Sequence, residues 1–291
     1  MIYVTGDMII DEYLYGETKR ISPEAPVPIV DLTSREKRWG GCGNVYNNCN
    51  AIQDDTKLAC YYDGRNEHMF TYDKEKNNYL RCDRIPQKTR IISQGRYMSR
   101  IDDEEWITCD FLERGIHDKW NTTKNDIVVF SDYNKGSIKN RREFIDKMTG
   151  KVLVDPKVKL DQYTGAYLVK PNLKEFEDYI GKCSSVKELI NKAQLTRDHL
   201  ELTYLVITMS EQGVLLIGDT IEQYESIVEE VSDVTGAGDV FMAGLAIGLD
   251  RGLSISQSTR VANILAGVSV SKNGTYTITP EDWDTAVKGL I

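Results

Sequence analysis

The strongest candidates for chemistry in this sequence are the acidic residues and glycines of Asp-Val-Thr-Gly-Ala-Gly-Asp, residues 233–239. Gly236 and Gly238 allow tight turns and the close approach of a ligand to the backbone. The small-residue helix expected after them points unpaired N–H groups and a positive dipole end at the turn, which suits a phosphoryl group. Asp239 can accept the proton of a hydroxyl nucleophile. The string therefore predicts phosphoryl transfer; the alternative is that Asp239 only caps a helix.

Motifs of several other enzyme classes are missing from the sequence. There is no G-x-x-x-x-G-K-[ST] string and no H-R-D or D-F-G set, which excludes P-loop enzymes and protein kinases. No G-x-G-x-x-G follows the first expected strand, which disfavours a dinucleotide-binding fold. The six cysteines show no C-x-x-C spacing and there are only three histidines, so no structural zinc site is expected. Free thiols in a reducing cytoplasm are the prediction for the cysteines.

Short apolar segments alternate with helical patterns along the chain. Strands are expected at residues 2–5, 127–131, 151–155, 166–170 and 205–208. Helices are expected at residues 43–53, 137–149, 172–180, 237–251 and 256–272. This alternation predicts the α/β class, with a central, mostly parallel sheet flanked by helices.

Two segments break this alternation. Residues 12–38 contain the proline-rich string Arg-Ile-Ser-Pro-Glu-Ala-Pro-Val-Pro, and residues 84–109 alternate with a period of two. Both are expected to form strands outside the main sheet, as a small β lid that excludes water from ligands at the carboxyl ends of the strands. No linker divides the chain, so residues 1–291 are expected to form a single domain.

The composition excludes several classes of partner. The formal net charge is −9, whereas nucleic-acid-binding domains are usually basic. No apolar run is long enough to span a membrane, and the N-terminus lacks the basic region of a signal peptide. We therefore expect a cytoplasmic protein with small-molecule substrates, without nucleic-acid or membrane partners.

The motif at 233–239, together with Trp-Gly-Gly-Cys-Gly-Asn at 39–44, resembles the two signatures of the ribokinase-like (PfkB) carbohydrate kinases. Within that family, the strings at 6–32, 131–137, 155–157, 170–177 and 208–213 are similar to the heptose 7-phosphate kinases, which also form the kinase half of bifunctional heptose synthases. The resemblance covers nearly the whole chain. It implies a ribokinase-like fold and an ATP-dependent sugar-phosphate kinase that phosphorylates C1 of D-glycero-D-manno-heptose 7-phosphate.

The resemblance also assigns roles to individual residues. Asp239 matches the catalytic base, with the anion hole at Gly236, Ala237 and Gly238. The sugar is expected to contact Asp11, Gly40, Gly41 and Asn44. Asn172 and Glu175 match a pair that organises Mg²⁺ near the ATP phosphates. Ser210, Glu211, Gly213 and Asn263 match positions that border the nucleotide, and Asp233 and Thr235 match a monovalent-cation site.

A substrate that already carries a phosphate requires cationic side chains. The candidates are Arg20, Arg90, Arg96 and Arg100. In one unbroken strand, residues 90, 96 and 100 would lie on the same face. The apolar lid residues Ile91, Tyr97 and Ile101 predict pairing with a second subunit, hence a homodimer.

The sequence departs from the family pattern at Cys42 and Gly43, where alanines are usual, at Met209, where arginine is common, and at Val240, where threonine is usual. No H-x-G-H string occurs, so a nucleotidyltransferase domain is not expected. Two alternatives remain open. One is a ribokinase-like kinase of another sugar or sugar phosphate, and the other is a catalytically silent sugar- or nucleotide-binding protein.

Overall fold

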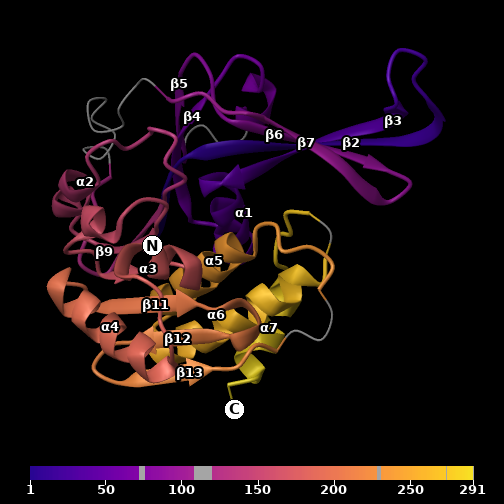
Figure 1. The fold of residues 1–291 in the computed structure, drawn as a ribbon. Coiled ribbons are helices and arrows are strands. Elements are labelled where there is room, and N and C mark those ends of the chain that lie inside the picture. The colour runs from indigo at the N-terminus through magenta and orange to yellow at the C-terminus, as the bar shows by residue number, and fades with distance from the viewer. Residues whose placement is uncertain (72–75, 108–119, 228–230, 273, 291) are drawn as a thin grey trace.

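A computed structural model describes residues 1–71, 76–107, 120–227, 231–272 and 274–290 (Figure 1). In this part of the chain, nine strands form the main sheet. In spatial order they are β13 (Ile221–Tyr224), β12 (Val214–Ile217), β11 (Tyr204–Thr208), β10 (Leu168–Val169), β9 (Lys151–Asp155), β8 (Ile127–Ser131), β1 (Ile2–Gly6), β4 (Lys57–Tyr62) and β5 (Asn78–Arg81). Neighbouring strands from β11 to β5 run parallel, and β12 and β13 form an antiparallel hairpin at one edge.

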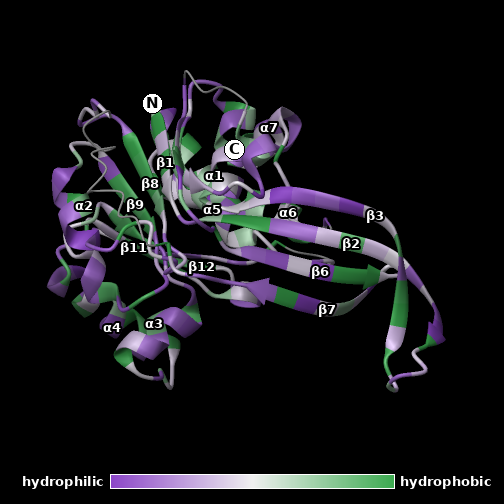
Figure 2. Cartoon of the chain, turned by 90° about the horizontal axis from the view of Figure 1, so that it is seen from above, coloured by the Kyte–Doolittle hydropathy of each residue, from purple (hydrophilic) through white to green (hydrophobic). Residues whose placement is uncertain are grey.

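Two layers of helices cover the main sheet. They are α1 (Cys42–Ile52), α2 (Arg141–Lys147), α3 (Leu173–Ile180), α4 (Val186–His199), α5 (Ala237–Asp250), α6 (Ile255–Val270) and α7 (Pro280–Lys288). Helices α1, α5, α6 and α7 pack on one face, and α2, α3 and α4 lie on the other (Figure 2). Short 3₁₀ turns occur at η1 (Glu67–Phe70), η3 (Leu160–Tyr163) and η4 (Ser210–Gln212). The predicted α/β architecture is confirmed.

The core lies between the sheet and these helices. Every residue of β1 and β8 is buried, because parallel strands covered on both faces have no solvent side. Apolar residues gather accordingly on the central strands, and polar residues on the outer faces of the helices (Figure 2). In the described ranges, no helix combines the length and apolar character needed to cross a membrane.

A second, four-stranded sheet projects from the body (Figure 1). Its order is β3 (Pro28–Gly41), β2 (Met8–Ile21), β6 (Gln87–Ser93) and β7 (Arg96–Asp103). It contains the two segments predicted as a lid; of these, residues 108–109 lie outside the described residues. The long β2–β3 hairpin extends beyond the other two strands, and the proline-rich string forms its tip.

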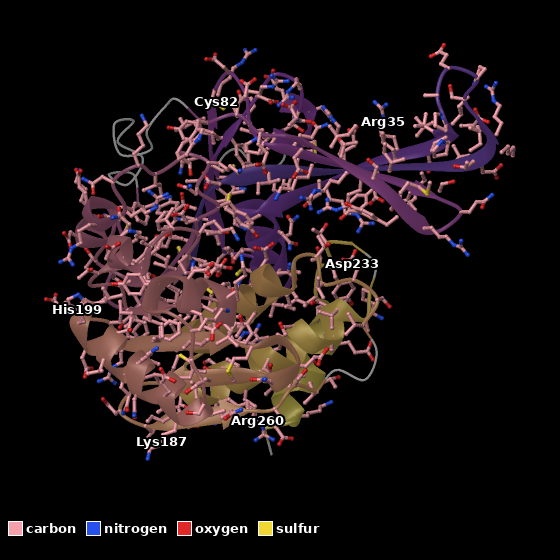
Figure 3. All side chains as sticks on the ribbon, viewed as in Figure 1. Arg35, Cys82, Lys187, His199, Asp233 and Arg260 are labelled. Atoms are coloured by element: carbon pink, nitrogen blue, oxygen red, sulfur yellow. The ribbon has the colours of Figure 1, made fainter. Side chains whose placement is uncertain are left out.

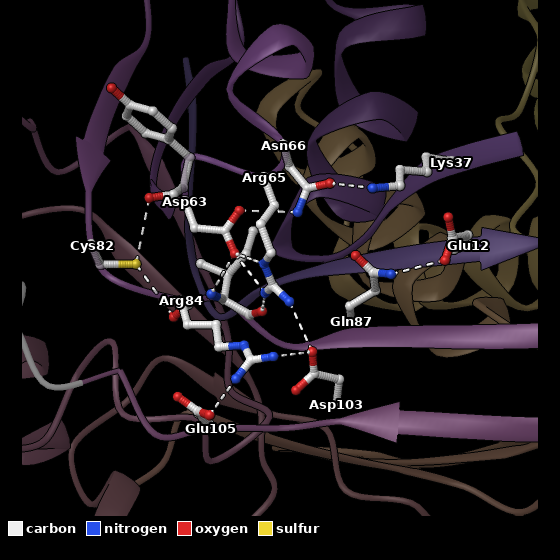
Figure 4. A network of polar contacts seen from close by, with 12 residues as sticks. Glu12, Lys37, Asp63, Arg65, Asn66, Cys82, Arg84, Gln87, Asp103 and Glu105 are labelled. Atoms are coloured by element: carbon white, nitrogen blue, oxygen red, sulfur yellow. Dashed lines mark hydrogen bonds and ion pairs between the residues drawn. The ribbon is translucent and has the colours of Figure 1, made fainter.

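A polar network fixes the base of this small sheet against the body (Figure 4). The buried carboxylate of Asp63, directly after β4, accepts hydrogen bonds from Arg65 and Asn66. Nη1 of Arg65 also donates to Oδ2 of Asp103, on β7, at 2.8 Å. Nζ of Lys37, on β3, donates to Oδ1 of Asn66 at 2.8 Å. Strands β3 and β7 are therefore both tied to the carboxyl end of β4.

Two expected elements differ in the structure. The helix expected at 137–149 is confined to α2, because Ser137 is held in a turn by Asp7 and the side chain of Asn140 caps the helix. The single strand expected through residues 90–100 is a hairpin, with Gln94 and Gly95 at positive φ between β6 and β7.

Candidate active site

Asp239 lies at the centre of the candidate site, in the first turn of α5 and 97% buried. Asn44 of α1 donates its Nδ2–H to Oδ2 of this carboxylate at 2.9 Å. The phenol of Tyr133, which follows β8, donates to Oδ1 at 2.9 Å. Burial raises the pKa of Asp239 to about 7, against the lowering effect of these two hydrogen bonds. A carboxyl group with this pKa is suited to general-base work near neutral pH.

The N-terminus of α5 has no side-chain cap. The residue at the N-cap position is Gly236, with φ 79°, and Asp239 directs its carboxylate to Asn44 and Tyr133 instead of to the helix backbone. The alternative that Asp239 only caps the helix is therefore wrong. A Cβ atom at Gly236 would lie 2.6 Å from Nδ2 of Asn44, so only glycine fits beside this amide. No side chain therefore competes for the N–H groups at the start of α5, of which that of Ala237 donates to the carbonyl of Val234 at 3.3 Å.

The turn that carries Tyr133 is held by Asp7, a buried residue directly after β1. Its carboxylate accepts the backbone N–H groups of Tyr133 and Lys135 at 2.9 Å and the hydroxyl of Ser137 at 2.6 Å. Burial raises the pKa of Asp7, against these hydrogen bonds. Asp7 therefore sets the backbone position from which Tyr133 reaches Asp239.

Gly40 and Gly41 end β3 where it meets α1, and Gly40 lies beside the side chain of Asp11 on β2. A Cβ atom at Gly40 would lie 2.2 Å from Oδ2 of Asp11, so glycine is required there. Asp11 is buried, and Arg90 of β6 forms an ion pair with its Oδ1. The structure thus brings the predicted sugar-contacting residues Asp11, Gly40 and Asn44 to the junction of the small sheet and the body.

An ion pair between a buried lysine and a partly exposed aspartate, which the sequence does not predict, lies beside the predicted anion hole. Nζ of Lys170, after β10, is 3.0 Å from Oδ1 of Asp155, at the end of β9. A Cβ atom at Gly238 would lie 3.6 Å from both side chains. Burial raises the pKa of Asp155, and Lys170 lowers it. The signal for these residues is their place in the sequence, directly after two parallel strands, where ligands bind in such sheets.

Asn172 and Glu175 form a reciprocal capping box at the start of α3. The Asn172 side chain accepts the N–H of Glu175 at 2.8 Å, and Oε2 of Glu175 accepts the N–H of Asn172 at 3.0 Å. Oε1 of Glu175 is 3.0 Å from Nζ of Lys157. In the part of the chain that the structure describes, no group of three or more His, Cys, Asp or Glu side chains could hold a metal ion.

The residues predicted to border the nucleotide lie near the antiparallel hairpin. Ser210 and Glu211 form the exposed turn η4 between β11 and β12, which Gly213 closes by donating to the Ser210 carbonyl at 3.0 Å. Asn263 of α6 donates to the carbonyl of Glu225, just after β13, at 2.8 Å. The structure therefore places these positions around one hairpin of the main sheet.

The Asp233 carboxylate shapes the loop before α5. It accepts the N–H and the hydroxyl of Thr235, at 2.9 and 2.7 Å, and the N–H of Gly274 at 2.9 Å. These hydrogen bonds lower the pKa of Asp233, against burial, which raises it. Figure 3 shows Asp233 on the body, toward the small sheet that carries Arg35.

The four candidate arginines do not form one cluster. Arg90 and Arg100 are cross-strand partners and therefore share a face of the small sheet. Arg96 pairs with Ser93 beyond a β-bulge, which turns it to the opposite face, so the expectation of a shared face is wrong for Arg96. Arg20 is exposed, nine residues along β2 from Asp11, roughly 30 Å at the usual rise of a strand.

The chain is similar to one family model and to several curated proteins. Residues 138–282 match the model described as pfkB family carbohydrate kinase. Bifunctional protein HldE of Haemophilus influenzae (strain PittEE) is 35% identical over 98% of this chain, and the protein of the same name from Escherichia coli O17:K52:H18 is 35% identical over 99%. The chain spans 63% of the length of these relatives.

Solved structures show the same fold. Phosphofructokinase-2 from Escherichia coli in complex with potassium has a TM-score of 0.82 at 17% identity and covers 99% of this chain and 98% of its own. Ribokinase from Thermotoga maritima has a TM-score of 0.77 at 20% identity, with 99% of both chains covered. These two structures have the same fold as this chain, and residues 138–282 match the model of a carbohydrate kinase family. The similarity to the pfkB family of carbohydrate kinases is shown for residues 138–282.

Proposed function

We propose that this chain transfers the terminal phosphoryl group of ATP to C1 of D-glycero-D-manno-heptose 7-phosphate. The observation that carries the proposal is the buried Asp239 carboxylate, held by Asn44 and Tyr133 beside the uncapped N-terminus of α5. Asp239 takes the proton of the sugar hydroxyl, whose oxygen attacks the γ-phosphorus as the bond to ADP breaks. The N–H groups of Gly236 and Gly238 and the ammonium of Lys170 stabilise the charge on the transferring group.

The choice of sugar rests on the small sheet. The proline-rich string at its tip is the part of the sequence most specific to the heptose 7-phosphate kinases, and Arg90 and Arg100 share the face that carries Asp11. ATP turnover measured with heptose 7-phosphate and a panel of other sugars and sugar phosphates tests this. Turnover with another sugar alone would favour the first alternative, and binding without turnover would favour a silent binding protein.

Mg²⁺ and a monovalent cation are part of the proposal. Mg²⁺ keeps several waters and binds through one or two carboxylates and substrate phosphates, so the single carboxylate of Glu175 fits a contact through water. When bound, Mg²⁺ neutralises charge on the ATP phosphates. The potassium complex of the structural neighbour supports a monovalent cation near Asp233 and Thr235, where the pKa of the Asp233 carboxyl is lowered.

Replacing Arg100 by alanine should raise the KM for the sugar phosphate about tenfold or more, because the loss of a charged hydrogen bond costs about 1.5–3 kcal/mol. The KM for ATP should change little. Arg96→Ala is the matched control, since Arg96 lies on the opposite face of the same hairpin. Steady-state kinetics with each substrate varied in turn decide the point. Equal effects of the two substitutions, or equal losses for both substrates, would contradict a phosphate-binding role for Arg100.

We also propose a homodimer formed through the small sheet. Tyr97, Ile101 and Leu32 are each more than half exposed there, and Ile91 is partly exposed. Tyr97 and Ile101 lie on opposite faces because of the bulge, so pairing would cover both. Light scattering at micromolar concentration should give twice the mass of the chain, and Ile101→Asp should halve it. A monomeric mass for the unsubstituted protein would contradict the proposal.

A cytoplasmic location completes the proposal. Within the described ranges, Cys42, Cys49, Cys60 and Cys82 are buried free thiols and Cys183 is a partly exposed one. Free thiols suit a reducing compartment. Cys109 lies outside the described residues.

A further inference from the structure

Tyr133 contacts the candidate base through the only polar atom of its side chain. Its hydroxyl lies 2.9 Å from Oδ1 of Asp239, while Asn44 occupies Oδ2. Burial and the nearby Asp239 carboxylate raise the pKa of Tyr133 well above its usual value. The phenol therefore keeps its proton and acts toward Asp239 as a hydrogen-bond donor, not as a second base.

The backbone around Tyr133 is built to hold this contact. Asp7 accepts hydrogen bonds from the N–H groups of Tyr133, Lys135 and Ser137 and from the Ser137 hydroxyl. These bonds anchor the turn on both sides of Tyr133. Asn134 has a positive φ of 56°, a conformation that the anchored turn maintains.

Tyr133 also touches the small sheet. Nζ of Lys88, on β6, lies 5.9 Å from the centre of the Tyr133 ring. Lys88 lies directly across from Asp11 of the neighbouring strand β2. Its Nζ is 3.7 Å from Oε1 of Glu104. The ring thus lies between the sheet that is expected to hold the sugar and the carboxylate expected to deprotonate it.

A carboxylate with both oxygens already bonded still has free lone pairs for a sugar hydroxyl. Two donors from different elements fix the rotation of the carboxyl plane, so those lone pairs keep one direction. We propose that Tyr133 is a positioning residue, whose phenol holds the Asp239 carboxylate in the orientation that proton transfer requires. This inference rests on the proposed role of Asp239 as the base.

Removal of the phenol should also change the ionisation of Asp239. A hydrogen bond to the charged form lowers the pKa of a carboxyl group, so Tyr133→Phe should raise the pKa of Asp239 above about 7. The other charged or titratable groups around the pair stay in place: Asp155 of β9, Lys170 after β10, Asp11 of β2, Asp7 after β1, Lys88 of β6 and Cys42 of α1.

The test compares the pH profile of kcat/KM for the sugar phosphate in Tyr133→Phe and in the unsubstituted protein. The acidic limb should move up by roughly one pH unit, with a roughly fivefold loss of kcat/KM at pH 7 that is almost fully recovered at pH 9. The KM for ATP and the thermal midpoint should change little. Tyr179→Phe, on α3, is the matched control for loss of a phenol and should leave the profile unchanged.

A direct titration separates this inference from the proposed function. In ¹³C NMR of the carboxyl groups, the resonance that disappears in Asp239→Asn belongs to Asp239, and its midpoint should rise in Tyr133→Phe. An unchanged midpoint, an equal loss of activity at every pH, or a raised sugar KM without a moved limb would overturn the positioning role. Normal turnover of Asp239→Asn would instead overturn the proposed base.

Discussion

Replacement of Asp239 by asparagine is expected to lower kcat by about 10²- to 10⁴-fold, the usual contribution of a general base. Asparagine keeps the shape of the side chain and can still bond to Asn44 and Tyr133, but it cannot take a proton from the sugar hydroxyl. ATP binding should be nearly unchanged, because the N–H groups at the start of α5 do not depend on this side chain. Rapid-quench kinetics at saturating ATP and sugar phosphate measure the loss.

The pH dependence provides a second measurement of the same residue. Because the pKa of Asp239 is raised to about 7, the base is ionised above that pH and kcat/KM should fall as the pH is lowered through it. The raised pKa also lowers stability, since the folded state then holds a proton more tightly than the unfolded chain. This destabilisation is absent below about pH 4, grows up to about pH 7 and is constant above it.

Asp239→Asn removes that destabilisation. The variant should therefore unfold at a higher temperature than the unsubstituted protein at pH 8, with the difference vanishing toward pH 4. A loss of activity with lowered stability at pH 8 would indicate that the substitution damages the fold. Near-normal turnover would remove Asp239 from the mechanism altogether.

The candidate-site residues that the sequence itself points to, and that the structure brings together, are continuous in the chain. The string 233–239 contains both the glycines and the acid, and the structure places them in one helical turn. Gly40, near the end of β3, likewise stands only four residues before Asn44, in the first turn of α1. Local spacing was enough because a helix N-terminus is itself the anion-binding element.

Local spacing could not predict that three further residues lie at the site, because their proximity depends on the order of the strands in the sheet. They are Tyr133, Asp155 and Lys170. Tyr133 and Lys170 follow β8 and β10, and Asp155 ends β9. They meet at the site only because these strands are parallel neighbours in the sheet. Their sequence surroundings predict a strand end and nothing about which strand lies beside it. The position of a parallel strand in its sheet is a long-range property.

The arginines show a different limit. Alternate residues lie on one face of a strand only while the strand is unbroken. The turn at Gln94 and Gly95 interrupts this alternation, and so does the bulge between Tyr97 and Ser99. Arg100 nevertheless joins Arg90, because a hairpin sets the two side by side as cross-strand partners. Arg96 is turned away by the same bulge.

Asn172 and Glu175 fit two interpretations at once. The spacing that suggests ion binding is also that of a capping box, and the structure contains the capping box. Glu175 additionally contacts Lys157. A role at the phosphates of ATP therefore stays a prediction, which the local geometry neither requires nor prevents.

Replacement of Lys170 by methionine is expected to lower kcat by about 10²- to 10³-fold, the scale of losing one preorganised electrostatic stabiliser of a transition state. The ammonium lies beside Gly238, in the turn predicted to bind the phosphoryl group, and Lys170 is only 3% exposed. Methionine retains most of the length and apolar volume of the stem. Single-turnover kinetics with bound ATP would separate this effect from weaker nucleotide binding.

The single substitution has a structural cost that must be separated from its effect on catalysis. It leaves the Asp155 carboxylate without its cation, and breaking a buried ion pair from one side costs on the order of 3 kcal/mol. Loss of Lys170 also raises the pKa of Asp155, since Lys170 is the main group that lowers it. Reduced activity of Lys170→Met alone would therefore be ambiguous.

The double variant Lys170→Met with Asp155→Asn removes both charges and should recover most of the lost stability. Its kcat should stay about 10²-fold or more below that of the unsubstituted protein, because the cation beside Gly238 is still missing. Chemical denaturation and turnover are measured on the same three proteins. If neutralising the pair restored turnover along with stability, Lys170 would serve only to balance Asp155, and the transferring phosphoryl group would be stabilised by the start of α5 alone.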